Sequence, residues 1–424
     1  MYIVIGVVVG LLVLSLLVVA HEFGHFLMAR RNGVEVEEFG IGFPPKAVAF
    51  VRKDGKWQRL AKKDWPKTDE EGKKTSALAL KGKGIVQDGL ILSLNWLPLG
   101  GFCQMKDEND ASMRKGSFGR ASFVVKTKIL FGGVAMNWLV AVIILTILAL
   151  TGMPHFLNNQ FEIKSDSKVA QSAEVVASKV MKGSPAAKSG MKSGDRILSM
   201  QAQGEEQLSV HSAVEAQQLS KRNAGKMVIL CYERSGQQIC KQTRLNKKSD
   251  EYVLGVQMSQ QKMTLYRSSW SAPIVGVATT LQITGATFQG LGELVANLAK
   301  GLVMKLNFTS HDQQVAGQKT LNKVGDSVSG PVGIVGVLFP AFVQAGLTNL
   351  AFLTALITIS LAVMNVLPIP ALDGGRWLMI AVARLRGKKL NAEKEARIVG
   401  KAFLFLMILI VVITILDISR IIMR

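Results

Sequence analysis

Two long stretches of this 424-residue sequence contain no lysine or arginine. They cover residues 129–163 and 324–375, although the whole chain has 51 basic and 30 acidic residues and a net charge of +21. The basic residues gather instead beside apolar runs, as they do at the cytoplasmic ends of membrane spans. A membrane therefore explains the excess of positive charge, and the sequence predicts no nucleic-acid partner.

The first apolar run also lacks the marks of a removable signal peptide. No hydrophilic segment precedes it and no small-residue cleavage site follows it, so we expect a retained span. Four runs come close to the roughly twenty residues that cross a hydrocarbon core, the last of them if Ile418, Ile421 and Ile422 extend it. These runs are Ile3–Ala20, Ile129–Leu150, Leu347–Leu367 and Ala402–Leu416.

The basic residues also predict a direction for each span, because positive flanks stay inside. Residues 30–128 and 376–401 are expected inside, and residues 153–346 and both chain ends outside. The predicted fold is a polytopic α-helical membrane protein with about four transmembrane helices, a membrane-associated β loop and an extracytoplasmic α+β domain. The segments expected are helix 1 at 1–29, the inner β-loop region at 30–128, helix 2 at 129–152, the outer domain at 157–262, an interfacial helix and loop at 263–346, helix 3 at 347–375, an inner loop at 376–401 and helix 4 at 402–420.

Segment 263–346 leaves two topologies open. Either both of its apolar parts, Trp270–Ala299 and Val328–Ala345, span the membrane or neither does, because a single extra span would reverse helix 3 against its flanking charges. Pro331 and Pro340 interrupt the second part. We therefore predict no span here, but an interfacial helix followed by a loop against the bundle.

The outer domain carries a recognisable local pattern. Gly183–Leu198 reads GSPAAKSGMKSGDRIL, which predicts a short helix between glycine turns and then a strand. A second helix is expected at Val210–Arg222 and paired strands at Lys226–Tyr232 and Gln238–Thr243. This region resembles a PDZ domain of the bacterial type. Such domains take peptides by adding a strand to a sheet edge, although this one could instead only block access or pack structurally.

Two of the three cysteines flank a short turn in that domain. A two-residue hairpin turn at Ser235 and Gly236 would place Cys231 directly opposite Cys240, close enough for a disulfide. The predicted outer location permits oxidation, so we expect a disulfide, with two buried free thiols as the alternative. Cys103, predicted to lie inside, is expected to be a reduced thiol.

The sequence HEFGH ends the first apolar run. His21 and His25 lie one helical turn apart on the same face, as two imidazole ligands of one zinc ion require. Glu22, the next position round the helix, could act as a base toward a water on the metal. Ionisable side chains at membrane depth cost a few kcal/mol and usually have a function. A catalytic zinc site still needs a third protein ligand.

The candidate for that ligand is far along the chain, in the run NVLPIPALDGG. Pro368 and Pro370 break the third span before Asp373, and broken backbone at membrane depth is tolerated where it lines a cavity. The first and third spans are both predicted to run inward, so Asp373 and the histidines could share one depth. The alternative is that Asp373 caps a helix near the membrane surface.

Taken together, these residues resemble the site-2 protease family of intramembrane zinc metalloproteases, in the RseP-like bacterial branch that carries a PDZ domain. The resemblance covers most of the chain. It is carried by HEFGH with the following Gly33–Phe43, by the strand loop Pro98–Met105, by GxxxN at Gly133–Asn137, by SGPxGI at Ser329–Ile334 and by NxxPxPxLDG at Asn365–Gly374.

The resemblance implies roles for individual residues. One Zn²⁺ would be held by His21, His25 and Asp373, with Glu22 as the general base. Asn365 would bind the substrate backbone or the developing oxyanion. Residue Asn137 is implied near the site, in substrate contact or in holding the loops, and its alternative is a helix-packing amide beside Gly133.

The implied function is cleavage of transmembrane segments in single-span membrane proteins, such as anti-sigma factors or remnant signal peptides, in the bacterial cytoplasmic (inner) membrane. Further implied partners are a peptide or chain end at the PDZ domain and membrane lipid. A catalytically idle PDZ scaffold and an ion-conducting transporter are the competing interpretations. The charged inner segment 52–90 is longer than the family pattern leads us to expect, and it could be a lineage-specific loop or a partner site.

Overall fold

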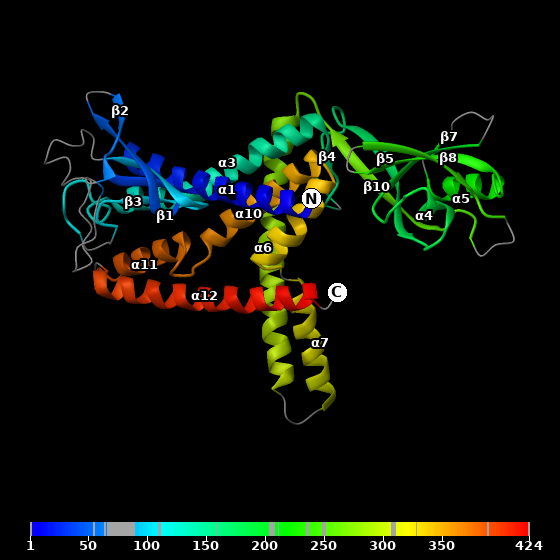
Figure 1. Ribbon diagram of the computed structural model, residues 1–424. Helices are drawn as coiled ribbons and strands as arrows, with labels where there is room; N and C mark the ends of the chain where they lie inside the picture. The colour runs from blue at the N-terminus through cyan, green and yellow to red at the C-terminus, as the bar shows by residue number, and fades with distance from the viewer. Residues whose placement is uncertain are drawn as a thin grey trace. The chain divides into compact units, whose positions relative to one another are not determined.

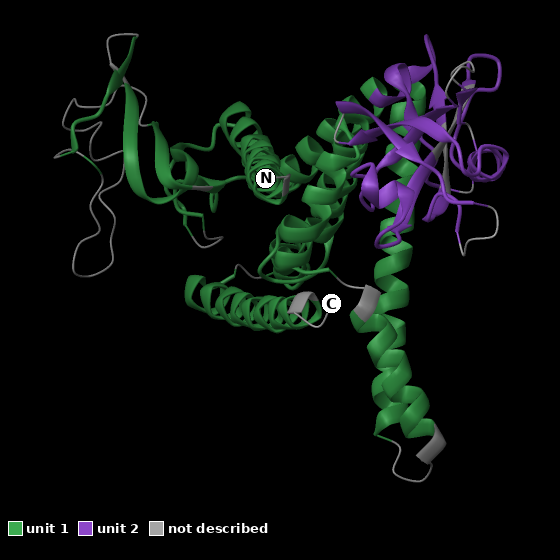
Figure 2. Cartoon of the chain, turned by 45° about the vertical axis from the view of Figure 1, so that its right-hand side comes forward, with its two compact units in different colours: residues 1–147, 273–424 green, residues 148–272 purple. Residues whose placement is uncertain are grey.

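The chain forms two compact units, each described here by itself. Unit 1 comprises residues 1–147 and 273–424, and unit 2 comprises residues 148–272 (Figure 2). The computed structural model describes residues 2–53, 56–62, 65, 90–108, 112–157, 159–202, 208–210, 212–234, 237–247, 252–306, 311–327, 329–387 and 390–422.

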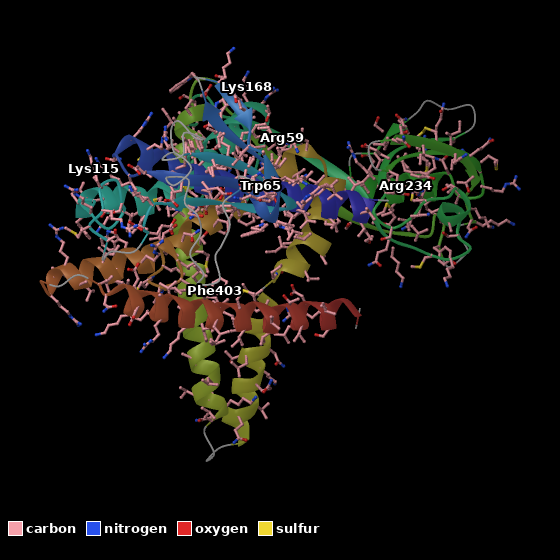
Figure 3. The ribbon with its side chains drawn as sticks, turned by 60° about the vertical axis from the view of Figure 1, so that its left-hand side comes forward. Arg59, Trp65, Lys115, Lys168, Arg234 and Phe403 are labelled. Atoms are coloured by element: carbon pink, nitrogen blue, oxygen red, sulfur yellow. A yellow bond between two sulfur atoms is a disulfide. The ribbon has the colours of Figure 1, made fainter. Side chains whose placement is uncertain are left out.

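Four helices are long enough and apolar enough to cross a membrane, which matches the predicted count. They are α1 (Tyr2–Arg31), α3 (Phe123–Thr151), α10 (Leu347–Val366) and α12 (Ala392–Ile422) (Figure 1). Many of their large apolar side chains are exposed, among them Phe403 on α12 (Figure 3). Such faces are stable when lipid covers them, so the protein is an integral membrane protein.

Segment 263–346 corrects part of the prediction. It contains one long helix, α6 (Ala272–Lys305), where a helix was expected. Where a loop was expected, the chain is again largely helical, with α7 (His311–Ser327) followed by a helical run made of α8 (Pro331–Gly333), η2 (Ile334–Leu338) and α9 (Phe339–Gln344).

The two prolines do not prevent this helical run. Pro331 lies in the first turn of α8, where its missing amide hydrogen needs no partner. Pro340 is the second residue of α9, which directly follows the π-helical turn, and π-turns accommodate local irregularities in helices. The run packs on α1, because Gly6 and Gly10 leave room for Pro340 and Phe339.

A small antiparallel sheet in unit 1 has the order β2-β1-β3, formed by β1 (Val36–Lys53), β2 (Lys56–Arg59) and β3 (Ile91–Met105). Both long strands fold back on themselves, since Phe39 pairs with Leu92 on one side and with Cys103 on the other. Residues 101–105 therefore form an outer edge of the sheet. This is the predicted strand loop, whereas most of segment 52–90 lies outside the described residues.

Unit 2 is built on a sheet with the strand order β4-β10-β5-β6-β8-β9, to which β7 adds beside β6. The predicted short helix is α4 (Pro185–Lys188), and the second predicted helix is α5 (Ala213–Arg222). The strands are β4 (Met153–Pro154), β5 (Lys168–Val180), β6 (Arg196–Ala202), β7 (Leu208–Ser209), β8 (Met227–Arg234), β9 (Gln237–Arg244) and β10 (Val256–Arg267). Buried apolar side chains from the sheet and both helices form one core, with Ala186, Ile197, Ala216 and Leu230 among them.

Two covalent or ionic contacts hold unit 2 together. Cys231 and Cys240 pair across β8 and β9 and are joined as a disulfide. The guanidinium of Arg234 (Figure 3) donates two hydrogen bonds, of 2.7 and 2.6 Å, to the buried carboxylate of Asp195. Asp195 also accepts from the amide of Lys192, so this carboxylate fixes the turn before β6.

Candidate metal centre

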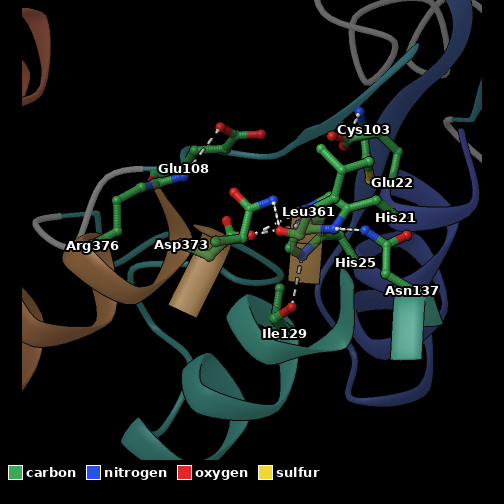
Figure 4. A network of polar contacts seen from close by, with 11 residues as sticks. His21, Glu22, His25, Cys103, Glu108, Ile129, Asn137, Leu361, Asp373 and Arg376 are labelled. Carbon is green, nitrogen blue, oxygen red and sulfur yellow. Dashed lines mark hydrogen bonds and ion pairs between the residues drawn. The ribbon is translucent and has the colours of Figure 1, made fainter. Parts of the chain in front are cut away.

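His21 and His25 lie in the C-terminal half of α1 and face the same direction. Both side chains are buried, and their Nε2 atoms are 3.1 Å apart. The helical spacing of four residues brings the two rings together, as the sequence predicts. Both Nε2 atoms are close to one carboxylate oxygen of Asp373, and Figure 4 shows the three side chains together.

Asp373 reaches the same point from the other end of the chain. Its Oδ2 atom lies 3.1 Å from Nε2 of His21 and 3.4 Å from Nε2 of His25. Helix α10 ends at Val366, and α11 (Asp373–Leu385) begins with this aspartate. The predicted third ligand therefore does meet the histidines, across 352 residues of sequence.

The turn that delivers Asp373 depends on two glycines. A Cβ atom at Gly374 would lie 2.1 Å from the carbonyl oxygen of Val366, and one at Gly375 would lie 2.0 Å from that of Ile369. Any side chain would collide with this backbone, so the broken segment can fold back tightly only with glycine at both positions.

Each imidazole has a partner behind it. Nδ1 of His25 lies 2.8 Å from the carbonyl oxygen of Ile129, so Nδ1 carries the proton and Nε2 keeps its lone pair. Nδ1 of His21 lies 3.3 Å from Nδ2 of Asn137, a fully buried residue whose Oδ1 has no hydrogen-bond partner among the described residues. The nitrogen and oxygen of an amide group have nearly the same shape. With the two exchanged, Oδ1 of Asn137 would accept a hydrogen bond from the Nδ1 proton of His21.

A glycine on α3 keeps the space between the ligands open. A Cβ atom at Gly133 would lie 2.6 Å from Nε2 of His25 and 2.7 Å from Nε2 of His21. Gly24, the residue directly before His25 on α1, faces Gly132 on α3, and a Cβ there would lie 2.2 Å from the Gly132 carbonyl oxygen. Small residues thus allow α1 and α3 to approach closely and leave the nitrogen atoms accessible.

The donor set fits a catalytic zinc ion. The two imidazole nitrogens and one carboxylate oxygen all lie within 4.8 Å of one another. Three protein ligands of these types, with a fourth position left open, are typical of catalytic zinc. The unpartnered Asn137 Oδ1 also fits, since a histidine that binds metal through Nε2 must donate its Nδ1 proton.

Glu22 lies beside this donor set and is held by the β sheet. Its Oε2 atom accepts a 3.1 Å hydrogen bond from the backbone amide of Cys103. The carboxylate faces a cavity of about 250 Å³. The cavity is lined by His21, Glu22, His25, Cys103, Met105, Glu108, Leu130, Asn365, Ala371, Leu372, Asp373 and Arg376. Glu22 is therefore placed to exchange protons with a molecule bound there.

The two asparagines take different positions. Asn365 lines the cavity, and its side-chain amide donates a 3.0 Å hydrogen bond to the carbonyl oxygen of Leu361. Asn137 does not line the cavity, because it is fully buried behind His21. The contact of Asn137 in this structure is with a candidate ligand, His21, and its expected role toward the substrate stays a prediction.

Burial raises the pKa of the Cys103 thiol, and the nearby carboxylates of Glu22 and Glu108 add to this effect. The thiol therefore stays protonated and neutral, consistent with the free cysteine expected here. The contact that Cys103 makes in the site is the one from its backbone amide to Glu22.

Two further charged residues of the cavity wall were missed from the sequence. Glu108 lies three residues after Met105, and Arg376 lies three residues after Asp373. The helical spacing between Asp373 and Arg376 could have indicated a shared face. Arg376 was instead explained by the topology alone, as one of the positive charges that flank a span.

Comparison with known proteins finds a family and relatives that cover most of the chain. The chain matches the sequence pattern of Peptidase family M50 over residues 9–61 and 83–410. It is 27% identical to zinc metalloprotease RasP of Bacillus licheniformis, over 98% of this chain and 99% of the relative. It is 26% identical to the regulator of sigma-W protease RasP of Bacillus subtilis, over 98% of each chain.

Proposed function

Because this chain belongs to Peptidase family M50, in which it is a zinc metalloprotease, we propose that it cleaves transmembrane segments of single-span membrane proteins. The relative from Bacillus subtilis is named a regulator of sigma-W protease, which supports substrates of the membrane-bound anti-sigma class. Remnant signal peptides are the second substrate class that we propose.

One observation carries this proposal. His21, His25 and Asp373 converge within 4.8 Å, and Glu22 beside them faces the same cavity. The two elements that meet here are the C-terminal part of an apolar helix and the break after another. Buried ionisable groups in such a setting are retained for function, and these are the groups that metal-assisted hydrolysis needs.

The chain's own residues supply the remaining chemistry. When bound, zinc acts as a Lewis acid that makes water a good nucleophile near neutral pH. Glu22 accepts a proton from the attacking water and returns it to the nitrogen of the leaving amine. The amide of Cys103 holds the Glu22 carboxylate in position, and Asn365 is the candidate partner for the substrate backbone or the oxyanion.

A helical substrate has to unwind locally, because its amides are bonded within the helix. The outer edge of β3 lies next to Glu22, and its residues other than Cys103 and Met105, whose amides are held by carboxylates, offer a place for the extended segment by addition of a strand. Side chains near the turn of β3 are apolar and exposed, with Trp96 exposed by 72%. They suit contact with lipid or with an apolar substrate.

We propose that unit 2 is a PDZ domain outside the cytoplasmic membrane, where it binds a peptide or chain end or restricts access. The core, the two helices and the hairpin of this unit support that assignment. The flanking basic residues support the proposed topology, and membrane lipid is the surrounding partner. A catalytically idle PDZ scaffold is the competing function.

The variant Glu22→Gln tests the proposal, with the full chain in liposomes and a single-span reporter shortened on its outer side. We expect zinc content by elemental analysis to stay unchanged and cleavage to fall at least about 100-fold, since general base catalysis is lost. The exposed Glu293→Gln on α6 is the control and should cleave normally. Full cleavage by Glu22→Gln would refute the mechanism, and a full cellular phenotype without cleavage would favour the scaffold.

A further inference from the structure

The outer edge of β3 presents two backbone amides toward the cavity, and both are held by carboxylates. The amide of Cys103 donates to Glu22, and the amide of Met105 donates to Oε1 of Glu108 at 2.9 Å. Residues 103 and 105 point the same way because side-chain and amide directions alternate along a strand. Glu108 therefore fixes the end of the outer segment 101–105 of β3, and Cys103 in the middle of that segment positions the base, Glu22.

The guanidinium of Arg376 grips this strand end from α11. Its Nη2 donates a 2.8 Å hydrogen bond to the backbone carbonyl of Glu108, and its Nη1 lies 4.0 Å from Oε2 of the same residue (Figure 4). Nη2 also lies 3.8 Å from a carboxylate oxygen of Glu395 in the first turn of α12. This side chain of α11 thus contacts both the strand loop and α12.

Arg376 shares the first turn of α11 with Asp373. Positions three apart lie on one face of a helix, so the groups that hold the strand and the metal point to the same cavity. Arginine is suited to this arrangement because its planar fork offers several donors at fixed angles. Its side chain is 21% exposed, which limits screening by water.

We propose that Arg376 and Glu108 form a clasp that holds the outer strand of β3 at a fixed distance from Asp373. The two residues act as positioning residues: they keep the Cys103 amide on Glu22 and the aspartate on the histidines at the same time. This proposal rests on the proposed function, since it concerns the base and the metal ligands of that site.

The sign of the effect on zinc affinity separates a clasp from a simple electrostatic role. A positive charge repels a divalent cation, so removal of the guanidinium charge alone should strengthen zinc binding. Loss of positioning acts in the opposite direction, and the loss of a residue bonded directly to a ligand, about 10–100-fold in affinity, sets the upper range for a residue that acts through the strand. Weaker zinc binding after the charge is removed is therefore diagnostic of positioning.

The test compares Arg376→Gln with Arg386→Gln, which removes the same charge from an exposed position at the end of α11. The full chain in detergent is stripped of metal and titrated with zinc against a competing fluorescent chelator. We expect Arg376→Gln to weaken zinc binding about tenfold, and Arg386→Gln to match the unaltered chain. Equal or tighter binding by Arg376→Gln would overturn the clasp. If Arg376→Gln does not fold, Arg376→Lys replaces it, with intermediate weakening expected and unchanged affinity overturning the proposal.

Hydrogen exchange of residues 101–105 provides a readout that needs no metal. We expect Glu108→Ala and Arg376→Gln to speed exchange of the Met105 amide, whereas Glu108→Gln keeps an acceptor for that amide and changes exchange less. Unchanged exchange in both Glu108→Ala and Arg376→Gln would overturn the clasp. If the unaltered chain neither binds zinc nor cleaves, the proposed function fails, and faster exchange in the variants still establishes the clasp.

Discussion

The side-chain amide of Asn137 lies 3.3 Å from Nδ1 of His21, on the side of the ring away from Asp373. This contact turns a buried helix-packing residue into a support for a candidate ligand. Asn137→Leu fills similar space without an acceptor, and we expect its zinc affinity to fall about 10–100-fold in competition with a chelator. Asn137→Asp keeps an acceptor for His21, and its zinc affinity should fall less than that of Asn137→Leu.

The matched control for Asn137 is Thr358→Val. The hydroxyl of Thr358 donates to the backbone carbonyl of Asn137, so its removal alters packing at the same residue without touching the amide. Zinc affinity should stay within about twofold of the unaltered chain, because the contact to His21 remains. Equal losses in Asn137→Leu and Thr358→Val would show that packing, not the hydrogen bond, is what matters.

Gly133→Ala adds one methyl group beside the Nε2 atoms of His21 and His25. The new Cβ would lie 2.6 Å from Nε2 of His25, so we expect the zinc content of purified protein to fall below half. Gly285→Ala on α6 is the control, because nothing lies within 4 Å of a Cβ there. Alanine favours a helix by about 1 kcal/mol over glycine, so this control should not lower stability. Normal zinc content in Gly133→Ala would contradict the close packing of Gly133 against His21 and His25.

The Cys231–Cys240 disulfide joins residues nine positions apart in sequence. Closing a loop of that length stabilises a folded unit by about 2–3 kcal/mol through the unfolded chain. We expect Cys231→Ala to lower the free energy of unfolding of unit 2 by that amount. Thermal unfolding followed by far-ultraviolet circular dichroism measures this change. Mass spectrometry after alkylation without reductant should find neither Cys231 nor Cys240 alkylated. Alkylation of both cysteines would show that the disulfide is absent.

Asp166 supports the chain just before α6. Hydrogen bonds from Ser269, and then from Ser271, lower the pKa of the Asp166 carboxyl below its usual value of 3.8. A lowered folded-state pKa means that the contact stabilises the folded chain above pH 3.8 and is lost as the pH falls further toward the folded-state value.

Hydrogen exchange at the Ser269 and Ser271 amides measures that contact. Both amides donate to Asp166, so Asp166→Asn should speed their exchange at pH 7, after correction for intrinsic rates. The difference between the variant and the unaltered chain should shrink as the pH falls below 3.8. A difference that stays constant down to strong acid would contradict the role of the carboxylate.

Local patterns were sufficient for features that depend on neighbouring residues. The spacing of His21 and His25 places two rings on one helix face, and the apolar runs predict four long helices that the structure contains. The turn between β8 and β9 likewise predicts that Cys231 pairs with Cys240. In each case the deciding distances are short along the chain.

The helical run at residues 331–344 was not predicted, because its two prolines were expected to interrupt a helix. Pro331 and Pro340 led to a predicted loop where the chain is helical. Whether a proline ends a helix depends on its position within the first turn and on the hydrogen-bonding pattern before it, and a π-helical turn precedes Pro340. The sequence does not reveal that pattern.

The amino-acid sequence by itself determined which residues could bind a metal and which runs could span a membrane, because helical periodicity and hydrophobic length are local properties. Only the tertiary structure decided what supports them: the Cys103 amide on Glu22, the Asn137 amide behind His21 and the Arg376 guanidinium on the Glu108 backbone. These contacts join segments from 81 to 268 residues apart. Their partners are selected by how whole helices and strands pack, which no stretch of sequence specifies alone.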